Sequence, residues 1–288
     1  MGSTATWHDK FNWRAEDYFD DPRTIELSRA IEANDLVTMD RLIAAGADVN
    51  AQGKGKMTPL LWAFPDNRLE RFRHLLQHGA NPNVLFESDF GTRGALQPGE
   101  AVTHLAAVTN FPGYFEAVFE RGGDPNLAKQ TLALGRGDTP LFCVIQSSAP
   151  NREQRIQWLV AHGANLDHIN GSEMTPAMLA VGYGGQYRLA WQLLQAGADP
   201  TIYAQSRSNQ RLIHLTLADG DARSATWSPQ QKADYGVLVQ WLEQQGESVA
   251  AARQDQARWK SWSVSLGEFR RKMDAEVSAR KARAQPGP

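Results

Sequence analysis

The chain has 288 residues, a formal net charge of −2, 42% hydrophobic residues and 22% charged residues. This composition is that of an ordinary globular protein and excludes collagen-like and disordered chains. A nearly neutral chain lacks the strongly basic face that non-specific nucleic-acid binding needs, so we expect no nucleic-acid partner. No run of eighteen apolar residues occurs, so no transmembrane segment is expected. The single cysteine, Cys143, excludes an internal disulfide.

Residues 1–22 form an aromatic and acidic leader, which we expect to pack along the first repeat of the region that follows. It contains Trp7, Phe11, Trp13, Tyr18 and Phe19. We recognise no signal-peptide pattern in residues 1–22 and expect that a native signal peptide could have been removed. The first six residues of the leader fit the loose N-myristoylation pattern, but Met-Gly-Ser is also a common expression start.

Residues 23–246 contain about six copies of one repeat. Its clearest mark is the string Gly-Ala-Asx-x-Asx, which begins at Gly46, Gly79, Gly122, Gly163 and Gly197, with Ala replaced by Gly after Gly122 and the final Asx missing after Gly197. The first two glycines are 33 residues apart and the last two are 34 apart. Each glycine is expected to end a helix in a left-handed conformation, and the Asx residues to turn the chain into a finger.

A second string keeps the same period and predicts where helices begin. Thr58-Pro59, Thr139-Pro140 and Thr175-Pro176 each precede an apolar run. Threonine suits a helix cap and proline suits the first turn, where its missing N–H is not needed. Two further copies lack the Thr-Pro pair but keep a histidine, His104 and His214, which we expect to bond backbone between repeats.

These strings resemble the ankyrin-repeat family, with its Thr-Pro-Leu-His-x-Ala and Gly-Ala-x-x-Asn signatures. The resemblance covers about residues 23–246. It implies an all-α solenoid of helix pairs with β-hairpin fingers, in which stacking of neighbours buries the apolar faces. Leucine pairs such as Leu75-Leu76 and Leu193-Leu194 are expected on the inward face of the second helices.

Residues 247–288 are expected to form C-terminal capping helices and a basic tail. The predicted helices are Val249–Lys260 and Leu266–Arg283, with Trp259 and Trp262 available to cover the end of the solenoid. The basic run of the tail suits a solvated helix face. Attraction to an anionic membrane or an acidic partner is the alternative.

Departures from the regular period indicate where a partner would bind. Leu85–Glu100 and Leu127–Asp138 lengthen two fingers, and ankyrin-type solenoids bind through fingertips and inner helices. Phe90, between Asp89 and Arg93, is predicted to be an exposed interface anchor inside a charged rim. That the loops are merely tolerated insertions is the alternative. The predicted partner-binding residues are Glu87, Asp89, Phe90, Arg93, Gln97, Glu100, Trp62, Phe64, Asn110, Phe111, Tyr183 and Tyr187.

No arrangement of residues points to catalysis, so we expect no enzyme and no cofactor. Gly53–Lys56 lacks the spacing of a phosphate-binding loop, and no Gly-x-Ser-x-Gly nucleophile motif occurs. His74 and His78 stand four apart on a predicted helix, as metal ligands can. We expect no third ligand beside them and therefore no metal. A metal hydrolase built on this pair is the remaining enzymatic alternative.

Three distinctive segments narrow the resemblance. They are the leader (Trp7–Trp13 with Glu16–Pro22), the long finger (Asp89–Gly94) and the C-terminal region (Ala257–Trp262 with Phe269–Asp274), and together they resemble a bacterial group of ankyrin proteins. That group includes immunity proteins encoded beside type VI secretion phospholipase effectors. The resemblance implies a periplasmic protein, its leader peptide removed, that binds a secreted phospholipase toxin and occludes its active site. It is expected to be a monomer alone. The alternative is a non-inhibitory scaffold or adaptor, in the cytoplasm if no leader peptide was present.

Overall fold

The computed structural model describes residues 6–90, 96–132, 135–204 and 209–262. The chain divides into two compact units, residues 1–179 and residues 180–288. The described part is mostly helical. Within it, no helix is both long enough and apolar enough to cross a membrane.

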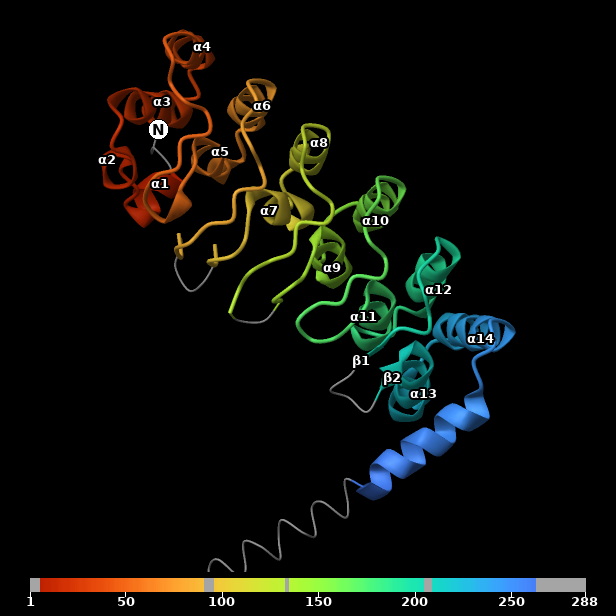
Figure 1. Ribbon diagram of the computed structural model, residues 1–288. Helices are drawn as coiled ribbons and strands as arrows, with labels where there is room; N and C mark the ends of the chain where they lie inside the picture. Colours follow the sequence, from red (N-terminus) through yellow and green to blue (C-terminus); the bar gives the residue numbers. More distant parts are fainter. Residues whose placement is uncertain (1–5, 91–95, 133–134, 205–208, 263–288) are drawn as a thin grey trace, which may run out of the picture. The chain divides into compact units, whose positions relative to one another are not determined.

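Unit 1 begins with the two short helices of the leader and continues as helix pairs stacked side by side. The first helices of these pairs form one layer and the second helices form another (Figure 1). The leader helices are α1 (Trp7–Phe11) and α2 (Ala15–Tyr18). The pairs are α3 (Pro22–Ala33) with α4 (Leu36–Ala44), α5 (Pro59–Ala63) with α6 (Leu69–Gln77), α7 (Val102–Val108) with α8 (Tyr114–Phe119), and α9 (Pro140–Gln146) with α10 (Arg152–Ala161). Single 3₁₀ turns, η1 (Lys54–Lys56) and η2 (Pro65–Asn67), stand before and after α5.

Unit 2 holds the remaining elements, and α11 (Pro176–Gly182) spans the division between the units. The others are α12 (Tyr187–Gln195), β1 (Tyr203–Ala204), β2 (Gln210–Arg211), α13 (Leu212–Arg223), η4 (Ser224–Thr226) and α14 (Pro229–Gln244). A further helix occupies residues 249–262. The two strands pair antiparallel, with Tyr203 opposite Arg211. Among the described residues this is the one finger with strand geometry, so the expectation of β-hairpin fingers holds only weakly.

A helix begins after each of the three predicted Thr-Pro pairs, and a capping hydrogen bond forms at two of them, whereas the Thr139 side chain makes none within the described residues. The Thr58 hydroxyl accepts the N–H of Leu61 at 3.1 Å, and the Thr175 hydroxyl accepts that of Met178 at 3.3 Å. The finger glycines all have positive φ, between 83° at Gly163 and 108° at Gly197. Side chains other than glycine rarely adopt this conformation, which explains why glycine ends each second helix.

Successive fingers of unit 1 are clamped together by asparagine side chains. The amide nitrogen of Asn50 donates to the Gly79 carbonyl at 2.9 Å, and its oxygen accepts the Asn81 N–H at 2.7 Å. Asn83 and Asn126 repeat this pair of bonds one and two fingers further on. Each clamp satisfies backbone groups at a helix end, so it fixes the spacing of adjacent helix pairs.

His104 fills the predicted role of a buried link between backbone segments. Its Nδ1 accepts the Ala101 N–H at 3.0 Å, so the proton is on Nε2, which donates to the Leu127 carbonyl at 2.9 Å. Burial lowers the pKa of His104 to about 4. The imidazole is therefore neutral near pH 7 and is part of the core of unit 1.

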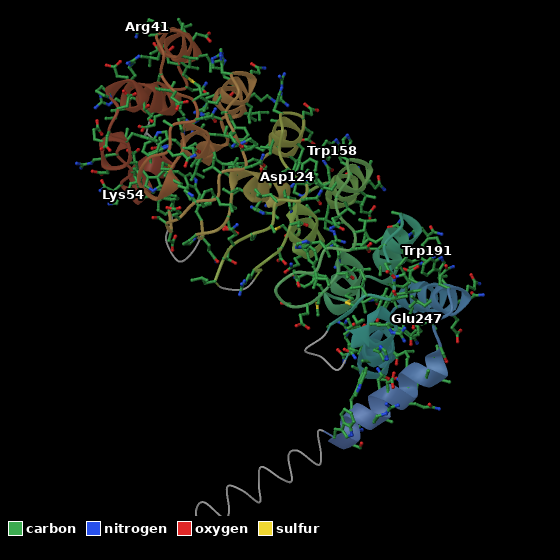
Figure 2. All side chains as sticks on the ribbon, viewed as in Figure 1. Arg41, Lys54, Asp124, Trp158, Trp191 and Glu247 are labelled. Atoms are coloured by element: carbon green, nitrogen blue, oxygen red, sulfur yellow. The ribbon has the colours of Figure 1, made fainter. Side chains whose placement is uncertain are left out.

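The polar and apolar faces are distributed as the repeat pattern predicts. Leu75, Leu76, Leu193 and Leu194 are all buried. Second helices carry polar side chains on their outer face, such as Arg41 on α4 (Figure 2).

The predicted C-terminal cap is only partly described. The helix predicted at Val249–Lys260 is present. The Trp259 ring lies 4.8 Å from the His214 ring, between centroids, whereas Trp262 is 63% exposed and borders an open hollow that Trp259 and His214 also line. Leu266–Arg283 lies outside the described residues.

Candidate partner-binding groove

Where the leader packs on the first repeats lies a group of aromatic rings, here called the leader cluster: the buried Trp13, Trp62 and Phe90 and the half-buried Tyr18. Trp13 meets the Trp62 ring at 5.5 Å and meets the Phe90 ring edge-on at 6.4 Å. The buried imidazole of His8 donates from Nε2 to the Trp62 carbonyl at 3.0 Å. These contacts fasten the leader to the start of the second helix pair.

The expectation that Phe90 is an exposed anchor is wrong, because only 3% of it is exposed. Its N–H donates to the Leu96 carbonyl at 3.1 Å, which turns the side chain inward. Gly55 makes room for it, since a Cβ there would lie 2.9 Å from the Phe90 ring. Phe90 therefore ties the long finger to the leader.

Two other predicted contact residues are also buried. Trp62 is fully buried, and its indole N–H donates to Glu32 at 3.1 Å. Tyr187 is 1% exposed, and its hydroxyl is hydrogen-bonded to Asp219. Both sit on the face of their helix that packs against neighbours, a distinction that aromatic character alone does not reveal.

An open, mainly apolar groove of about 230 Å³ lies on unit 1 next to the leader cluster. Phe64, after α5, and Phe111, after α7, form part of its wall, with ring centroids 6.1 Å apart. Both were predicted to contact a partner, and both are half-buried. The complete lining is Trp7, Phe64, Pro65, Leu96, Leu105, Val108, Thr109 and Phe111.

Two buried arginines fix the backbone of the groove walls. Arg71 donates to the carbonyls of Ala63 at 3.2 Å and Pro65 at 2.7 Å. Arg155 donates to the carbonyls of Ala107 and Thr109, both at 3.0 Å. Each guanidinium thereby satisfies carbonyls that the end of a first helix leaves unpaired. Hydrogen bonds within the protein therefore hold both walls in place.

Asp66 joins the leader to the same wall. Its carboxylate accepts the Trp7 N–H at 2.8 Å and lies 3.4 Å from the Arg71 guanidinium. This carboxylate therefore places the Trp7 ring at the edge of the groove.

The predicted charged residues of the long finger lie apart from the groove lining. Glu87 is exposed and forms an ion pair with Lys56 at 2.7 Å. Glu100 pairs with Lys129 of the next finger at 2.6 Å, and both side chains are more than four-fifths buried. The charge of Glu100 is therefore neutralised within the protein, and its expected role toward a partner is not supported.

The remaining predicted residues are scattered. Asp89 and Asn110 are exposed, and Gln97 is half-buried. Tyr183 is 51% exposed and belongs to unit 2. Arg93 lies outside the described residues.

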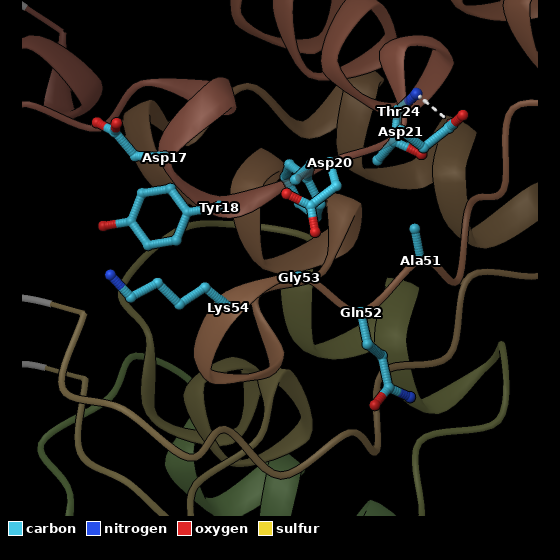
Figure 3. A pocket seen from close by; sticks show the side chains of 10 residues that line it. Asp17, Tyr18, Asp20, Asp21, Thr24, Ala51, Gln52, Gly53 and Lys54 are labelled. Atoms are coloured by element: carbon cyan, nitrogen blue, oxygen red, sulfur yellow. Dashed lines mark hydrogen bonds between the residues drawn. The ribbon is translucent and has the colours of Figure 1, made fainter.

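A second, polar hollow of about 440 Å³ lies between the leader and residues 51–54 (Figure 3). Asp17, Asp20 and Asp21 line it, and Lys54 stands on the opposite side. The Asp21 carboxylate accepts the Thr24 N–H at 2.9 Å, which lowers its pKa. Acidic groups on the leader thus mark a surface suited to basic partners.

Sequence reasoning missed most of the groove lining. Trp7 is expected only in the packing of the leader, and Leu105 and Val108 are not among the predicted contact residues. The available signal is their position on a first helix, three residues apart, next to a repeat whose first helix ends at Phe64. Leu96 carried no signal, because its position depends on how the long finger folds.

One side-chain group could hold a metal. Asp40, His74 and His78 bring one ligand atom each to within 4.8 Å of one another. The expectation that no third ligand lies beside the two histidines is therefore wrong.

Comparison with known proteins identifies the repeat. Residues 103–204 match the family model for ankyrin repeats, in three copies. Many solved structures share the fold. Among them is an ankyrin repeat domain from Acinetobacter baumannii AYE, with 16% identity and a TM-score of 0.54, matched over 74% of this chain and 96% of that one. No curated protein is significantly similar to the chain in sequence. Residues 103–204 therefore contain ankyrin repeats, a protein-interaction module that is generally non-enzymatic.

Proposed function

We propose that the chain binds a partner protein through the groove of Trp7, Phe64, Val108 and Phe111. The observation that carries this proposal is an apolar groove whose walls are fixed by buried Arg71 and Arg155. Binding energy concentrates where apolar or aromatic anchors fill preformed pockets. A rigid wall spares the partner the cost of ordering it.

The size of the groove favours side chains of a protein over a free small molecule. Pockets that hold drug-sized ligands usually measure about 300–1,000 Å³. This groove is smaller, about 230 Å³, and open to solvent. It suits one or two large apolar side chains presented by a partner surface.

The partner that we propose is a secreted phospholipase toxin, and the chain is its immunity protein. Two of the segments that resemble the bacterial immunity group build or support the groove. The first supplies Trp7 to the lining and Trp13 to the leader cluster, and the second supplies Phe90 to that cluster. The resemblance and the groove thus involve the same part of unit 1.

In this proposal the chain acts by occlusion in the periplasm. An apolar side chain from the rim of the toxin's active site enters the groove. The acidic hollow beside Asp17 and Asp20 meets basic residues of the toxin that would hold the lipid phosphate. Silencing a membrane-attacking enzyme requires tight binding, and nanomolar affinity corresponds to about −12 kcal/mol.

The matched variants Val108→Asp and Val37→Asp test the binding surface. Val108 lines the groove, whereas Val37 is 80% exposed on the outer helix α4. The bait is the full chain, and the prey is a purified secreted phospholipase of the proposed class. We expect Val108→Asp to weaken binding at least tenfold by calorimetry and Val37→Asp to leave it unchanged. Equal binding by both variants would remove the groove from the interface.

Lipase activity separates the finer proposal from the coarser one. With an equimolar amount of the wild-type chain, we expect phospholipase activity to fall below a tenth of its free value. Val108→Asp should restore it. Tight binding with full lipase activity would instead identify a scaffold or adaptor.

A further inference from the structure

We infer that Asp40, His74 and His78 form a binding site for one divalent transition-metal ion of the zinc class. His74 lies on α6 and His78 follows one turn later, where that helix ends. Asp40 lies on α4, the second helix of the preceding pair. The site therefore bridges two helix pairs and is separate from the groove.

The distances between ligand atoms suit such an ion. The Nε2 atoms of His74 and His78 lie 2.9 and 3.3 Å from the same oxygen, Oδ1 of Asp40. Zinc bonds to nitrogen and oxygen measure about 2.0–2.2 Å, so two ligand atoms on a tetrahedral ion stand roughly 3.3 Å apart. Small side-chain rotations would bring all three atoms to one ion.

The chemistry of the three side chains selects the metal. Two imidazoles and one carboxylate suit zinc, cobalt or nickel, whereas magnesium and calcium prefer oxygen ligands alone. Histidines four residues apart on a helix point to the same side and can share one ion. Three protein ligands leave at least one position for water.

His74 provides an independent reason. Its Nε2 is buried but forms no hydrogen bond within the described residues, although it lies close to the Asp40 carboxylate. A buried polar atom without a hydrogen-bond partner is unusual in native proteins. A metal ion between the three side chains would satisfy it. Asp40 and His78, 58% and 37% exposed, leave the ion a path from solvent.

A bound ion would link α4 to α6 through its three ligands, an arrangement here called the metal clip. An ion that binds the folded chain and not the unfolded one raises stability by mass action. The clip would join the first two helix pairs, which are also the pairs that hold the leader.

The binding test uses the full chain, zinc and three variants. Asp40→Asn and His78→Gln remove one ligand each at exposed positions. His162→Gln is the matched control, because His162 precedes Gly163 as His78 precedes Gly79, but stacks on Trp158 at 3.6 Å. We expect calorimetry to find one zinc per wild-type chain, no magnesium binding, and at least tenfold weaker zinc binding by the two ligand variants only. No zinc binding, or an equal loss with His162→Gln, would overturn the inference.

Cobalt absorption spectra and thermal unfolding provide two further measurements. Cobalt bound to the wild-type chain should give the visible absorption of a four- or five-coordinate ion, and His78→Gln should lose it. Zinc should raise the melting temperature of the wild-type chain, a chelator should reverse the rise, and His78→Gln should show neither effect. An unchanged wild-type melting temperature at saturating zinc would contradict the clip.

Discussion

The leader cluster and the groove are both built from aromatic residues of unit 1, but the cluster is mostly buried and the groove is open to solvent. Trp62 and Phe90 are covered by the leader, whereas Phe64 and Phe111 line an open wall. The leader contributes to both, since Trp13 fills the cluster and Trp7 borders the groove. An aromatic residue in a polar loop is therefore not evidence of an interface until the segments that can cover it are placed.

The largest expected effect comes from breaking the cluster. Trp62→Ala removes a fully buried ring with four ring neighbours from the leader, and Trp-to-Ala changes in cores cost about 3–5 kcal/mol. Urea unfolding should show this loss. Phe111→Ala, the counterpart in the groove, should cost under about 1 kcal/mol because its side chain is half-exposed. Equal losses would contradict the distinction between the two surfaces.

Low pH should reduce the free energy of unfolding of unit 1, because His104 becomes protonated when the chain unfolds. His104 lies on α7, the helix that also carries the groove residues Leu105 and Val108. Burial depresses the pKa of His104 from 6.5 to about 4, so the unfolded chain binds its proton at higher pH than the folded chain. Stability is complete above pH 6.5 and falls as the pH drops toward 4. The pKa difference between the unfolded and folded chain corresponds to about 3 kcal/mol of folding stability.

Unfolding free energies at pH 7 and pH 4 measure this dependence. His104→Asn should be less stable at pH 7 and should lose less on acidification. His162→Gln, at an exposed stacked histidine, should keep the wild-type slope. An unchanged slope in His104→Asn would show that other groups carry the acid sensitivity.

A smaller effect is expected where one finger serves both surfaces. Asn83 clamps the base of the finger that carries Phe90 into the cluster and Leu96 into the groove. Asn83→Ala should cost about 1–2 kcal/mol through the unpaired backbone groups of the next finger. The backbone N–H of Asp124 donates to the side-chain oxygen of Asn83, so hydrogen exchange at Asp124 should become faster in this variant. Unaltered exchange there would mean that the clamp is dispensable.

We expect the smallest effect from a change at Glu87, which lies in neither the leader cluster nor the groove. Its pair with Lys56 is solvent-exposed, and such pairs contribute at most about 1 kcal/mol. Glu87→Gln should leave both the unfolding free energy and partner affinity nearly unchanged. A tenfold loss of affinity would move the interface toward the fingertip.

Local rules predicted much of the fold. Thr58 and Thr175 cap helices, and the glycines from Gly46 to Gly246 end them, because these preferences act within one turn of chain. Phe64 and Phe111, predicted to contact a partner, both line the groove, and their contact with a partner stays a prediction. Burial of Phe90 was not predictable, since it depends on a leader 70 residues away in sequence folding over the finger.

The position of Asp40 beside the two histidines could have been predicted from the repeat spacing. Asp40 and His74 are 34 residues apart, close to the 33-residue period between Gly46 and Gly79. Residues one period apart occupy neighbouring positions on adjacent second helices of the stack. A search for polar residues at that spacing would have found the third ligand.

The central claim is that the partner meets the groove and not the outer helices. A photo-crosslinking amino acid at position 108 or at position 37, in otherwise identical full-length chains, tests it most directly. We predict that position 108 crosslinks to the bound phospholipase and that position 37 does not. Crosslinks from position 37, with none from position 108, would contradict the account.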